Sequence, residues 1–372
     1  MKVLICAGGT GGGIYPALAV ATELMRSGVP NEDILWVGTR GEMEEELVPR
    51  AGLHLQMIRG GAIVGVPPHV MMMNAAKLTW SIGTASRIMR QFKPDVMFMT
   101  GGYMAAPVSL AARLHGVPIS IYLPDVEPGS SIKAVMPLAQ KVACTTEGSR
   151  AYVPAQKMVV TGYPVRPELR AAAAMSQEEA LAQFDLQPGR PTLFVFGGSR
   201  GALNINRALM AGLPTLLQQI QVIHISGTLT WSQVEANLVN LSQEERAFYR
   251  PYPYLHERMG AAFRAADLVL ARAGASMLGE TPAFGLPSIL VPLAWAWRYQ
   301  KVNADFLTER GTAVQLTDET LPDKLVPTVL DLLGDKTRLA TMRTAAQALD
   351  IPDATAKLAQ VVMECGRKAV HD

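Results

Sequence analysis

Short apolar runs rich in β-branched residues alternate along the chain with longer stretches of helical periodicity. The first half is expected to contain strands at Val3–Ala7, Ile34–Val37, Asp95–Met99 and Pro118–Tyr122. Helices are expected between and after them, at about Tyr15–Arg26, Glu42–Ala51, Ala105–His115 and Ser130–Ala139. This alternation predicts a parallel sheet with helices on both faces, whose ligands bind at the carboxyl ends of the strands.

The alternation pauses at the proline-flanked turn Gly162–Pro167 and resumes with a second series that begins at Thr192–Phe196. We therefore expect an α/β chain of two Rossmann-like, doubly wound domains, 1–163 and 164–353, which face each other across a ligand-binding cleft. The last helix, at about 354–369, has no strand after it. It is expected to pack back on the first domain.

The composition fits two globular domains, since the 372 residues are 49% hydrophobic and only 18% charged. A net charge of +2 without a Lys/Arg run argues against a nucleic-acid partner. Cys6, Cys144 and Cys365 form no CxxC pair, which is typical of free thiols in a reducing cytosol. The chain begins with a buried strand rather than a signal peptide, and its apolar runs end well before the ~20 residues of a membrane span. We expect a cytoplasmic protein.

Two glycine-rich turns each follow a predicted strand and open a predicted helix. The first is Ala7–Gly13, and the second, Phe196–Ala202, adds a serine hydroxyl and an arginine guanidinium. Glycines let backbone N–H groups approach an anion, and the helix dipole favours negative charge there. Because the first turn is neither a Walker loop nor a clean GxGxxG, a phosphate contact is favoured over a nicotinamide fingerprint, with a ligand-free tight turn as the alternative.

Two further segments of the second half carry candidate polar ligands. Ala271–Glu280 follows the strand Leu268–Leu270, and Glu280 lies about one turn into the expected helix. A carboxylate there could accept two hydrogen bonds from a ribose diol, although a single acid in a first helical turn is usually solvated. Gln300 follows the strand Ser288–Val291 and its loop, where its amide could reach sugar hydroxyls.

In this order the motifs resemble the MurG family, the N-acetylglucosaminyltransferases that make lipid II in peptidoglycan synthesis. The resemblance covers essentially the whole chain, and the glycine turns together with the ribose glutamate are characteristic of the family. The matching segments are Gly8–Gly12, Gly38–Gly41 with Glu44, Gly101–Tyr103, Gly162–Arg166, Gly197–Ala202, Arg272–Ser276 with Glu280, Gly285–Pro287, and Gln300 with Asn303–Ala304. The resemblance implies a GT-B fold, with the acceptor bound by the first domain and a UDP-sugar by the second.

The resemblance also implies roles for individual residues. Those expected to bind the donor are Thr10, Gly11, Gly12, Arg166, Gly197, Gly198, Ser199, Arg200, Leu255, Ala275, Ser276, Met277, Glu280 and Gln300. Those expected at the acceptor are Thr10, Gly11, Gly12, Gly13, Gly102, Tyr103 and Asp125. The second glycine turn and Arg166 would meet the donor diphosphate, the Leu255 backbone would meet uracil, and Glu280 would hold the ribose.

Several positions depart from the family pattern. Gly13 stands where the first loop normally ends in histidine, and Tyr122–Asp125 replaces the family's His-Glu-Gln-Asn segment. In the donor half, Met277 replaces a usual threonine, Tyr299 a common glutamine or histidine, and Trp295 and Trp297 stand where polar residues are usual. UDP-sugar use is therefore better supported than lipid I as the acceptor.

The expected reaction is a direct displacement at the anomeric carbon, inverting by resemblance, in which a general base deprotonates the acceptor hydroxyl. Since Gly13 has no side chain, Asp125 is the candidate base, with a turn-forming aspartate after Pro124 as the alternative. No Asp-x-Asp motif lies near the proposed donor site, so neither a metal nor a cofactor is expected. Three hypotheses stay open: a lipid II-forming transferase, a transferase with another lipid acceptor such as diacylglycerol or a polyprenyl-linked sugar, and a catalytically silent UDP-sugar-binding homologue.

A lipid-linked acceptor requires contact with a membrane surface. Ile63–Pro68 and Val70–Met73 are apolar and are followed by Lys77, Arg87, Arg90 and Lys93. An apolar patch with basic neighbours predicts a peripheral contact with the inner face of the cell membrane, and burial of the methionines in a core is the alternative.

Overall fold

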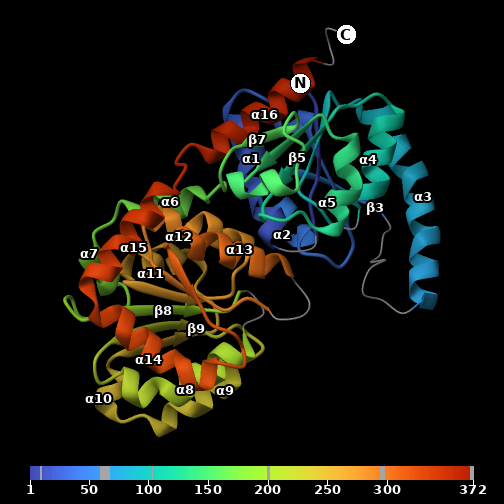
Figure 1. Cartoon of the computed structure of the whole chain (residues 1–372). Coiled ribbons are helices and arrows are strands. Elements are labelled where there is room, and N and C mark those ends of the chain that lie inside the picture. The colour runs from blue at the N-terminus through green and yellow to red at the C-terminus, as the bar shows by residue number, and fades with distance from the viewer. Residues whose placement is uncertain (9–10, 59–67, 103, 199–201, 294–297, 369–372) are drawn as a thin grey trace. The chain divides into compact units, whose positions relative to one another are not determined.

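The computed structural model describes residues 1–8, 11–58, 68–102, 104–198, 202–293 and 298–368, with no side chains described for 68–79, 298 and 368 (Figure 1). The chain forms two compact units: unit 1 is Met1–Arg166 with Asp353–Asp372, and unit 2 is Pro167–Pro352. The crossing between Arg166 and Pro167 lies three residues beyond the boundary predicted at 163.

Unit 1 contains a parallel sheet of seven strands in its described part, in the order β3-β2-β1-β4-β5-β6-β7. The strands are β1 (Val3–Cys6), β2 (Ile34–Thr39), β3 (His54–Ile58), β4 (Val96–Met99), β5 (Ile119–Leu123), β6 (Lys141–Cys144) and β7 (Met158–Val160). The helices are α1 (Gly11–Arg26), α2 (Glu44–Arg50), α3 (Pro68–Phe92), α4 (Ala105–Leu114), α5 (Ser130–Val135) and α16 (Ala354–Lys368). From β1 the strands are added toward one edge of the sheet up to β3, and from β4 they are added toward the other edge. A doubly wound sheet binds ligands at this change of strand order, between β1 and β4.

Successive side chains of each strand enter different cores on the two faces of this sheet. Val3 and Ile5 of β1 pack into the core under α1 and α16, whereas Leu4 and Cys6 pack into the core under α3 and α4. Helix α16 lies against α1 (Figure 1). Because both faces are buried, the strands read as continuous apolar runs, and the α/β class predicted from those runs is confirmed.

Unit 2 contains a second parallel sheet, with the strand order β10-β9-β8-β11-β12-β13 among its described residues. The strands are β8 (Thr192–Phe196), β9 (Gln221–Ile225), β10 (Tyr249–Tyr252), β11 (Leu268–Ala271), β12 (Ser288–Leu290) and β13 (Ala313–Gln315). The helices are α6 (Pro167–Ala173), α7 (Gln177–Ala182), α8 (Leu203–Leu216), α9 (Trp231–Asn237), α10 (Gln243–Arg246), α11 (Met259–Ala265), α12 (Glu280–Phe284), α13 (Arg298–Glu309), α14 (Leu321–Gly334) and α15 (Lys336–Ala348).

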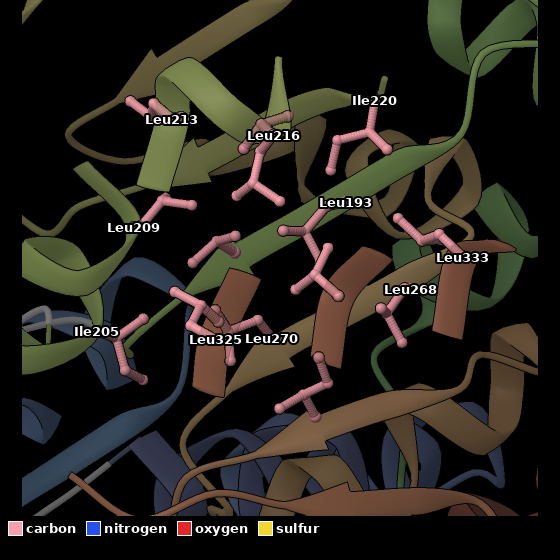
Figure 2. Packing of buried hydrophobic residues seen from close by; sticks show 14 of the residues in the cluster. Leu193, Ile205, Leu209, Leu213, Leu216, Ile220, Leu268, Leu270, Leu325 and Leu333 are labelled. Carbon is pink, nitrogen blue, oxygen red and sulfur yellow. The ribbon is translucent and has the colours of Figure 1, made fainter. Parts of the chain in front are cut away.

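The core on one face of this sheet is aliphatic. Figure 2 shows Leu193 of β8 and Leu268 and Leu270 of β11 among leucines and isoleucines from α8 and α14. The other face is aromatic, since the Phe194 ring centroid lies 5.2 Å from that of Phe263 of α11 in an edge-on contact. These two cores fix the central strands β8 and β11, whose ends carry most of the predicted donor residues.

Two expected helix limits were wrong, each because of local backbone chemistry. Helix α1 begins at Gly11 rather than near Tyr15, since the glycine turn itself forms the first helical turn. The helix expected over Ser130–Ala139 ends at Val135 and continues as one 3-10 turn, Met136–Leu138. Pro137 has no N–H to donate to the carbonyl of Lys133, so the α-helix cannot continue through it.

A buried histidine ties the amino-terminal part of α8 to β9 and β10. His224 is completely buried, with Nδ1 2.7 Å from Tyr249 Oη and Nε2 2.9 Å from Asn206 Oδ1. The Asn206 amide nitrogen donates to the Ser226 carbonyl at 2.8 Å, so its oxygen must be the atom that faces His224. Nε2 therefore carries the proton, Nδ1 accepts from the Tyr249 hydroxyl, and the ring is neutral.

This neutral histidine predicts acid sensitivity. Burial lowers the pKa of His224 to about 3, whereas an unfolded histidine titrates near ~6.5. Below about pH 6 the unfolded chain binds a proton that the folded chain does not, so the free energy of unfolding falls by about 1.4 kcal/mol per pH unit. Urea unfolding between pH 7 and pH 5 measures this slope. His224→Gln should flatten it, and an unchanged slope would rule out His224 as its source.

Candidate active site

The strand register of unit 2 brings the predicted donor segments to one edge of the sheet. Phe196 at the end of β8 pairs with Ile225 of β9 and with Ala271 of β11. Tyr252 of β10 pairs in turn with Ile225, and Leu290 of β12 with Ala271. Strands pair at ~4.8 Å spacing, so the loops that follow these strands leave the sheet side by side. The loops and helix starts that follow these strands carry Gly197, Gly198, Leu255, Ala275, Ser276, Met277, Glu280 and Gln300.

The glycine turn after β8 enters the left-handed backbone region that favours glycine. Gly198 has φ +85°, a conformation that L side chains rarely adopt, and it is exposed to solvent. Ala202 then precedes the 14-residue helix α8, whose first N–H groups have no intrahelical partner. The predicted ligands Ser199 and Arg200 lie outside the described residues.

The turn after β11 holds a carboxylate below the surface. Ala275–Leu278 forms one 3-10 turn, and Glu280 is the first residue of α12. Glu280 therefore starts a new helix rather than lying one turn into an existing one, because Gly279 breaks the 3-10 turn from α12. Its side chain is only 7% exposed, in contrast to the solvated acid that a first helical turn usually carries. Met277 is buried beside it, and Ser276 is half-buried.

The turn after β10 is strained at the position next to Leu255. His256 has φ +34°, which is unfavourable for a residue with a Cβ. Leu255 is 4% exposed, and its carbonyl accepts the Arg258 N–H at 2.8 Å. The ring of Tyr254 packs edge-on against that of His256, with centroids 4.6 Å apart. The Leu255 backbone is thus held at the sheet edge where a base is expected.

Helix α13 is attached to the same edge by two amide side chains. Gln300 Oε1 accepts the Leu293 N–H at 3.2 Å, and the fully buried Asn303 donates Nδ2 to the Ala273 carbonyl at 3.1 Å. Gln300 therefore lies at the end of β12, beside the turn that leads to Glu280. Its predicted neighbours in the loop, Trp295 and Trp297, are outside the part of the chain that the structure describes.

Unit 1 presents a corresponding edge. Cys6 at the end of β1 pairs with Val37 of β2 and Met99 of β4, and Met99 pairs with Ile121 of β5. A pocket at this edge is lined by the end of β2, the start of α2 and the loops after β1 and β4, among them Gly8, Gly38, Thr39, Glu44, Gly101, Gly102 and Met104. Gly11, Gly12 and Gly13 form the first turn of α1, while Thr10 and Tyr103 are not among the described residues.

Glu44 lines this pocket, although the sequence analysis assigned it no role. It is 2% exposed, and its Oε1 accepts the Thr39 N–H at 3.1 Å. A Cβ on Gly8 would lie 2.5 Å from that oxygen, so a larger residue at this position would displace the Glu44 carboxylate. Burial and the Glu44 charge together raise the pKa of the Cys6 thiol to about 12. The sequence feature that could have indicated a role for Glu44 is its position shortly after the Gly38–Gly41 turn.

Gly13 lies against Thr100 rather than against open space. The Thr100 hydroxyl donates to the Gly13 carbonyl at 3.0 Å. A Cβ on Gly13 would lie 3.0 Å from Oγ1 of that hydroxyl. The backbone of Gly13 is helical, so a larger residue would be limited by Thr100 and not by its φ angle. A histidine at this position would require a small movement of the Thr100 side chain.

The end of β5 and the segment that follows it contain few groups that could exchange a proton. Tyr122 is fully buried, and burial raises the pKa of its phenol well above the usual value. Thr145 donates its hydroxyl hydrogen to the Pro124 carbonyl at 2.8 Å, so Tyr122 Oη, 2.7 Å away, donates to Thr145. Glu127 is 1% exposed and paired with Lys133 Nζ at 2.7 Å. Asp125 is the half-buried carboxylate of this segment, two residues beyond the end of β5.

Arg166 belongs to unit 1, although the sequence analysis had placed it in the second domain, 164–353. Its guanidinium carbon lies 5.1 Å from the centroid of the Tyr15 ring on α1. No cluster of three or more His, Cys, Asp or Glu side chains suited to a metal ion occurs within the described ranges.

Comparison with known proteins covers both units. Residues 3–144 match the glycosyltransferase family 28 N-terminal domain, and residues 192–358 match the C-terminal domain of that family. The UDP-N-acetylglucosamine--N-acetylmuramyl-(pentapeptide) pyrophosphoryl-undecaprenol N-acetylglucosamine transferase, or MurG, of Roseiflexus sp. is 36% identical over 96% of this chain and 94% of its own. The transferase of the same name from Halalkalibacterium halodurans is 34% identical over 99% of this chain and 100% of its own. The chain belongs to the MurG family.

Solved structures agree with this assignment. The crystal structure of MurG from Acinetobacter baumannii is similar to this chain with a TM-score of 0.77 and 26% identity, over 98% of this chain and 99% of that one. The expected GT-B fold is thereby confirmed. A UDP-GlcNAc 2-epimerase from Neisseria meningitidis, at 14% identity and a TM-score of 0.66, shares the fold alone. Membership of the MurG family rests on the sequence identity over the full length of the chain. The segment Tyr122–Asp125 still departs from the family pattern.

Proposed function

We propose that this chain transfers N-acetylglucosamine from UDP-N-acetylglucosamine to the undecaprenyl-pyrophosphoryl-N-acetylmuramyl-pentapeptide acceptor of peptidoglycan synthesis. The observation that carries the proposal is the identity of 34–36% with curated transferases of that name, which extends over both units. By this proposal unit 2 binds the donor and unit 1 binds the acceptor. The reaction exchanges the bond from the anomeric carbon to UDP for a bond to the acceptor hydroxyl, with inversion.

The donor is held by the loops at the carboxyl edge of the unit 2 sheet. Glu280 accepts hydrogen bonds from the ribose hydroxyls, and the backbone at Leu255 pairs with uracil. The N–H groups after Gly198 at the start of α8 bind the diphosphate, where the helix dipole favours negative charge. Gln300 contacts the sugar. The shared edge and the burial of Glu280 support these roles.

The leaving diphosphate gains negative charge as the glycosidic bond breaks. Preorganised N–H donors and the Arg166 guanidinium stabilise that charge directly. No paired-carboxylate motif of the Asp-x-Asp type stands near the donor loops in the sequence. The reaction therefore needs no divalent cation in this proposal.

Turnover is accordingly expected to survive chelation. Initial rates in excess EDTA should remain within about twofold of the rates with added magnesium, since arginine and backbone donors already meet the charge. A metal-dependent sugar transferase assayed in the same buffers serves as the control. Activity that disappears in EDTA and returns with magnesium or manganese would contradict the proposed leaving-group stabilisation.

The acceptor hydroxyl must lose a proton, and Asp125 is the base in this proposal. It stands after β5, at the same edge as the glycine turns of β1 and β4. Tyr122 is held as a neutral hydrogen-bond donor, and Glu127 is paired with Lys133, so neither is suited to accept that proton. A carboxylate that is only half-buried keeps access to a substrate.

A lipid-linked acceptor places unit 1 against an anionic bilayer, on the inner face of the cell membrane. The side chains of the predicted apolar patch lie outside the described part of the chain, because residues 59–67 and the side chains of 68–79 are not described. In the described part, helices α3 and α4 pack together and expose large apolar side chains, with Trp80 73%, Leu114 68% and Leu110 41% exposed. Exposed Arg87, Arg90 and Arg113 lie on the same two helices. Apolar groups beside basic ones suit lipid tails and anionic head groups. Within the described residues no helix is long and apolar enough to cross a bilayer.

Charge reversal on α3 tests this contact. Arg87→Glu with Arg90→Glu is expected to weaken binding to phosphatidylglycerol vesicles roughly 30-fold or more, since each basic residue near such a surface contributes about 1 kcal/mol. The matched control is Lys336→Glu with Arg338→Glu, two exposed basic residues of α15 in unit 2. Vesicle co-sedimentation measures both. Equal loss in the two variants would indicate general electrostatics and contradict a docking face on α3 and α4.

Genetic complementation tests the proposed function in a cell. Expressed in a bacterium whose own MurG can be depleted, this chain is expected to restore growth, and the Glu280→Ala variant to fail at the same expression level. A stable, well-expressed chain that never restores growth would contradict transfer to this acceptor. Transfer to diacylglycerol or to another polyprenyl-linked sugar would then be the reaction to examine.

A further inference from the structure

The first turn of α1 and the side chain of Arg166 meet at one aromatic ring. Arg166 Cζ lies 5.1 Å from the ring centroid of Tyr15, inside the ~6 Å range of a cation–π contact. A Cβ on Gly11 would lie 3.1 Å from Cε2 of the same ring. The Tyr15 ring thus lies close to Gly11, one helical turn away in α1, and the Arg166 guanidinium lies over the same ring.

The backbones on both sides of this contact are fixed. Tyr15 lies between buried Ile14 and Pro16 in α1. Arg166 follows Tyr163 and Val165, which are 7% and 4% exposed. The guanidinium is attached by a long side chain with many rotamers, so holding it in one orientation costs conformational entropy. The ring contact restricts that conformational space before any ligand arrives.

We propose that Tyr15 is a positioning residue, whose ring holds the Arg166 guanidinium beside the first turn of α1, so that the guanidinium is oriented for a diphosphate. The inference rests on the proposed function, because it assumes that Arg166 binds the donor diphosphate. It goes beyond that function by assigning part of the affinity for a nucleoside diphosphate to a side chain that need not touch it. The tyrosine hydroxyl has no part in this role.

Substitutions at position 15 separate the ring's charge distribution from its size. Tyr15→Phe keeps the ring and is expected to retain UDP affinity. Tyr15→pentafluorophenylalanine keeps nearly the same shape but reverses the charge on the ring face, so it should weaken UDP binding roughly 3- to 30-fold. Tyr15→Leu should weaken it similarly, with a raised KM for UDP-N-acetylglucosamine and little change in kcat. Uridine, which has no phosphate, should bind all variants equally.

Calorimetry with UDP, repeated in an Arg166→Ala background, decides between the outcomes. The pentafluoro substitution should have no further effect once Arg166 is gone. Equal UDP affinity of the phenylalanine and pentafluorophenylalanine variants would overturn the inference, and so would a loss that persists undiminished without Arg166. If the natural chain binds no UDP, the proposed function itself fails. If the natural chain binds UDP and the ring variants bind it equally well, only the role of Tyr15 fails.

Discussion

Replacing Asp125 with asparagine is expected to lower turnover by roughly 10²–10⁴-fold while UDP binding stays intact, since that is the usual share of general base catalysis. Asparagine keeps the size of the side chain and its place after β5, but it cannot accept the proton of the acceptor hydroxyl. Turnover and UDP affinity should be measured on one preparation. Glu147→Gln is the matched control, because Glu147 is an exposed carboxylate just after the neighbouring strand β6.

The same assay should include Gly13→His. Thr100 Oγ1 stands 3.0 Å from the position of the new Cβ, so the histidine fits only if that side chain turns aside. If Asp125 is the base, the added histidine brings little gain. Unchanged turnover in Asp125→Asn would remove the assignment, and a large gain in Gly13→His would favour a homologue that lost its base with the family's histidine.

Glu280→Ala is expected to weaken UDP binding by roughly 1–3 kcal/mol, which is about 5- to 150-fold in Kd. The carboxylate is 7% exposed, so its loss removes a charged acceptor from a site that water enters poorly. Glu309→Ala, at the exposed end of α13, is the matched control. Thermal unfolding of each variant shows whether the fold is preserved.

A change in the ligand isolates the ribose contact. UDP that lacks both ribose hydroxyls should bind the natural chain as weakly as UDP binds Glu280→Ala, and the two changes together should add little. GDP and ADP should bind poorly to both proteins, since the Leu255 turn is the proposed uracil contact. Additive losses, or equal UDP affinity in Glu280→Ala, would contradict the assignment of Glu280 to the ribose.

The sheets and the edge that carries the site could be predicted from the sequence. Strands buried on both faces appear as continuous apolar runs, and the glycine turns that follow Val3–Cys6 and Thr192–Phe196 indicate the ligand-binding edge. The order of strands could not be predicted. It depends on which runs pair across the sheet, as with Phe196 and Ala271. That pairing brings the second glycine turn and Glu280 to the same edge.

Contacts between distant side chains were beyond sequence analysis. Arg166 was placed with the second domain because the prolines around it mark a turn, yet its guanidinium lies over Tyr15 in unit 1. Glu44 belongs to a recognised motif, but its burial against Gly8 follows only from the packing of α2 on the sheet. Pro137 marks the end of α5 in the sequence. The prediction missed that end because the residues around the proline continue the helical period.

The central claim is the identity of the acceptor, and product analysis tests it most directly. Purified protein is incubated with UDP-N-acetylglucosamine labelled in the sugar, together with undecaprenyl-pyrophosphoryl-N-acetylmuramyl-pentapeptide or with total membrane lipid. Chromatography and mass spectrometry should find one added N-acetylhexosamine on the pentapeptide-bearing lipid, in equal amount to the UDP released. Label on diacylglycerol or another lipid instead, or UDP binding without transfer to any lipid, would contradict the account.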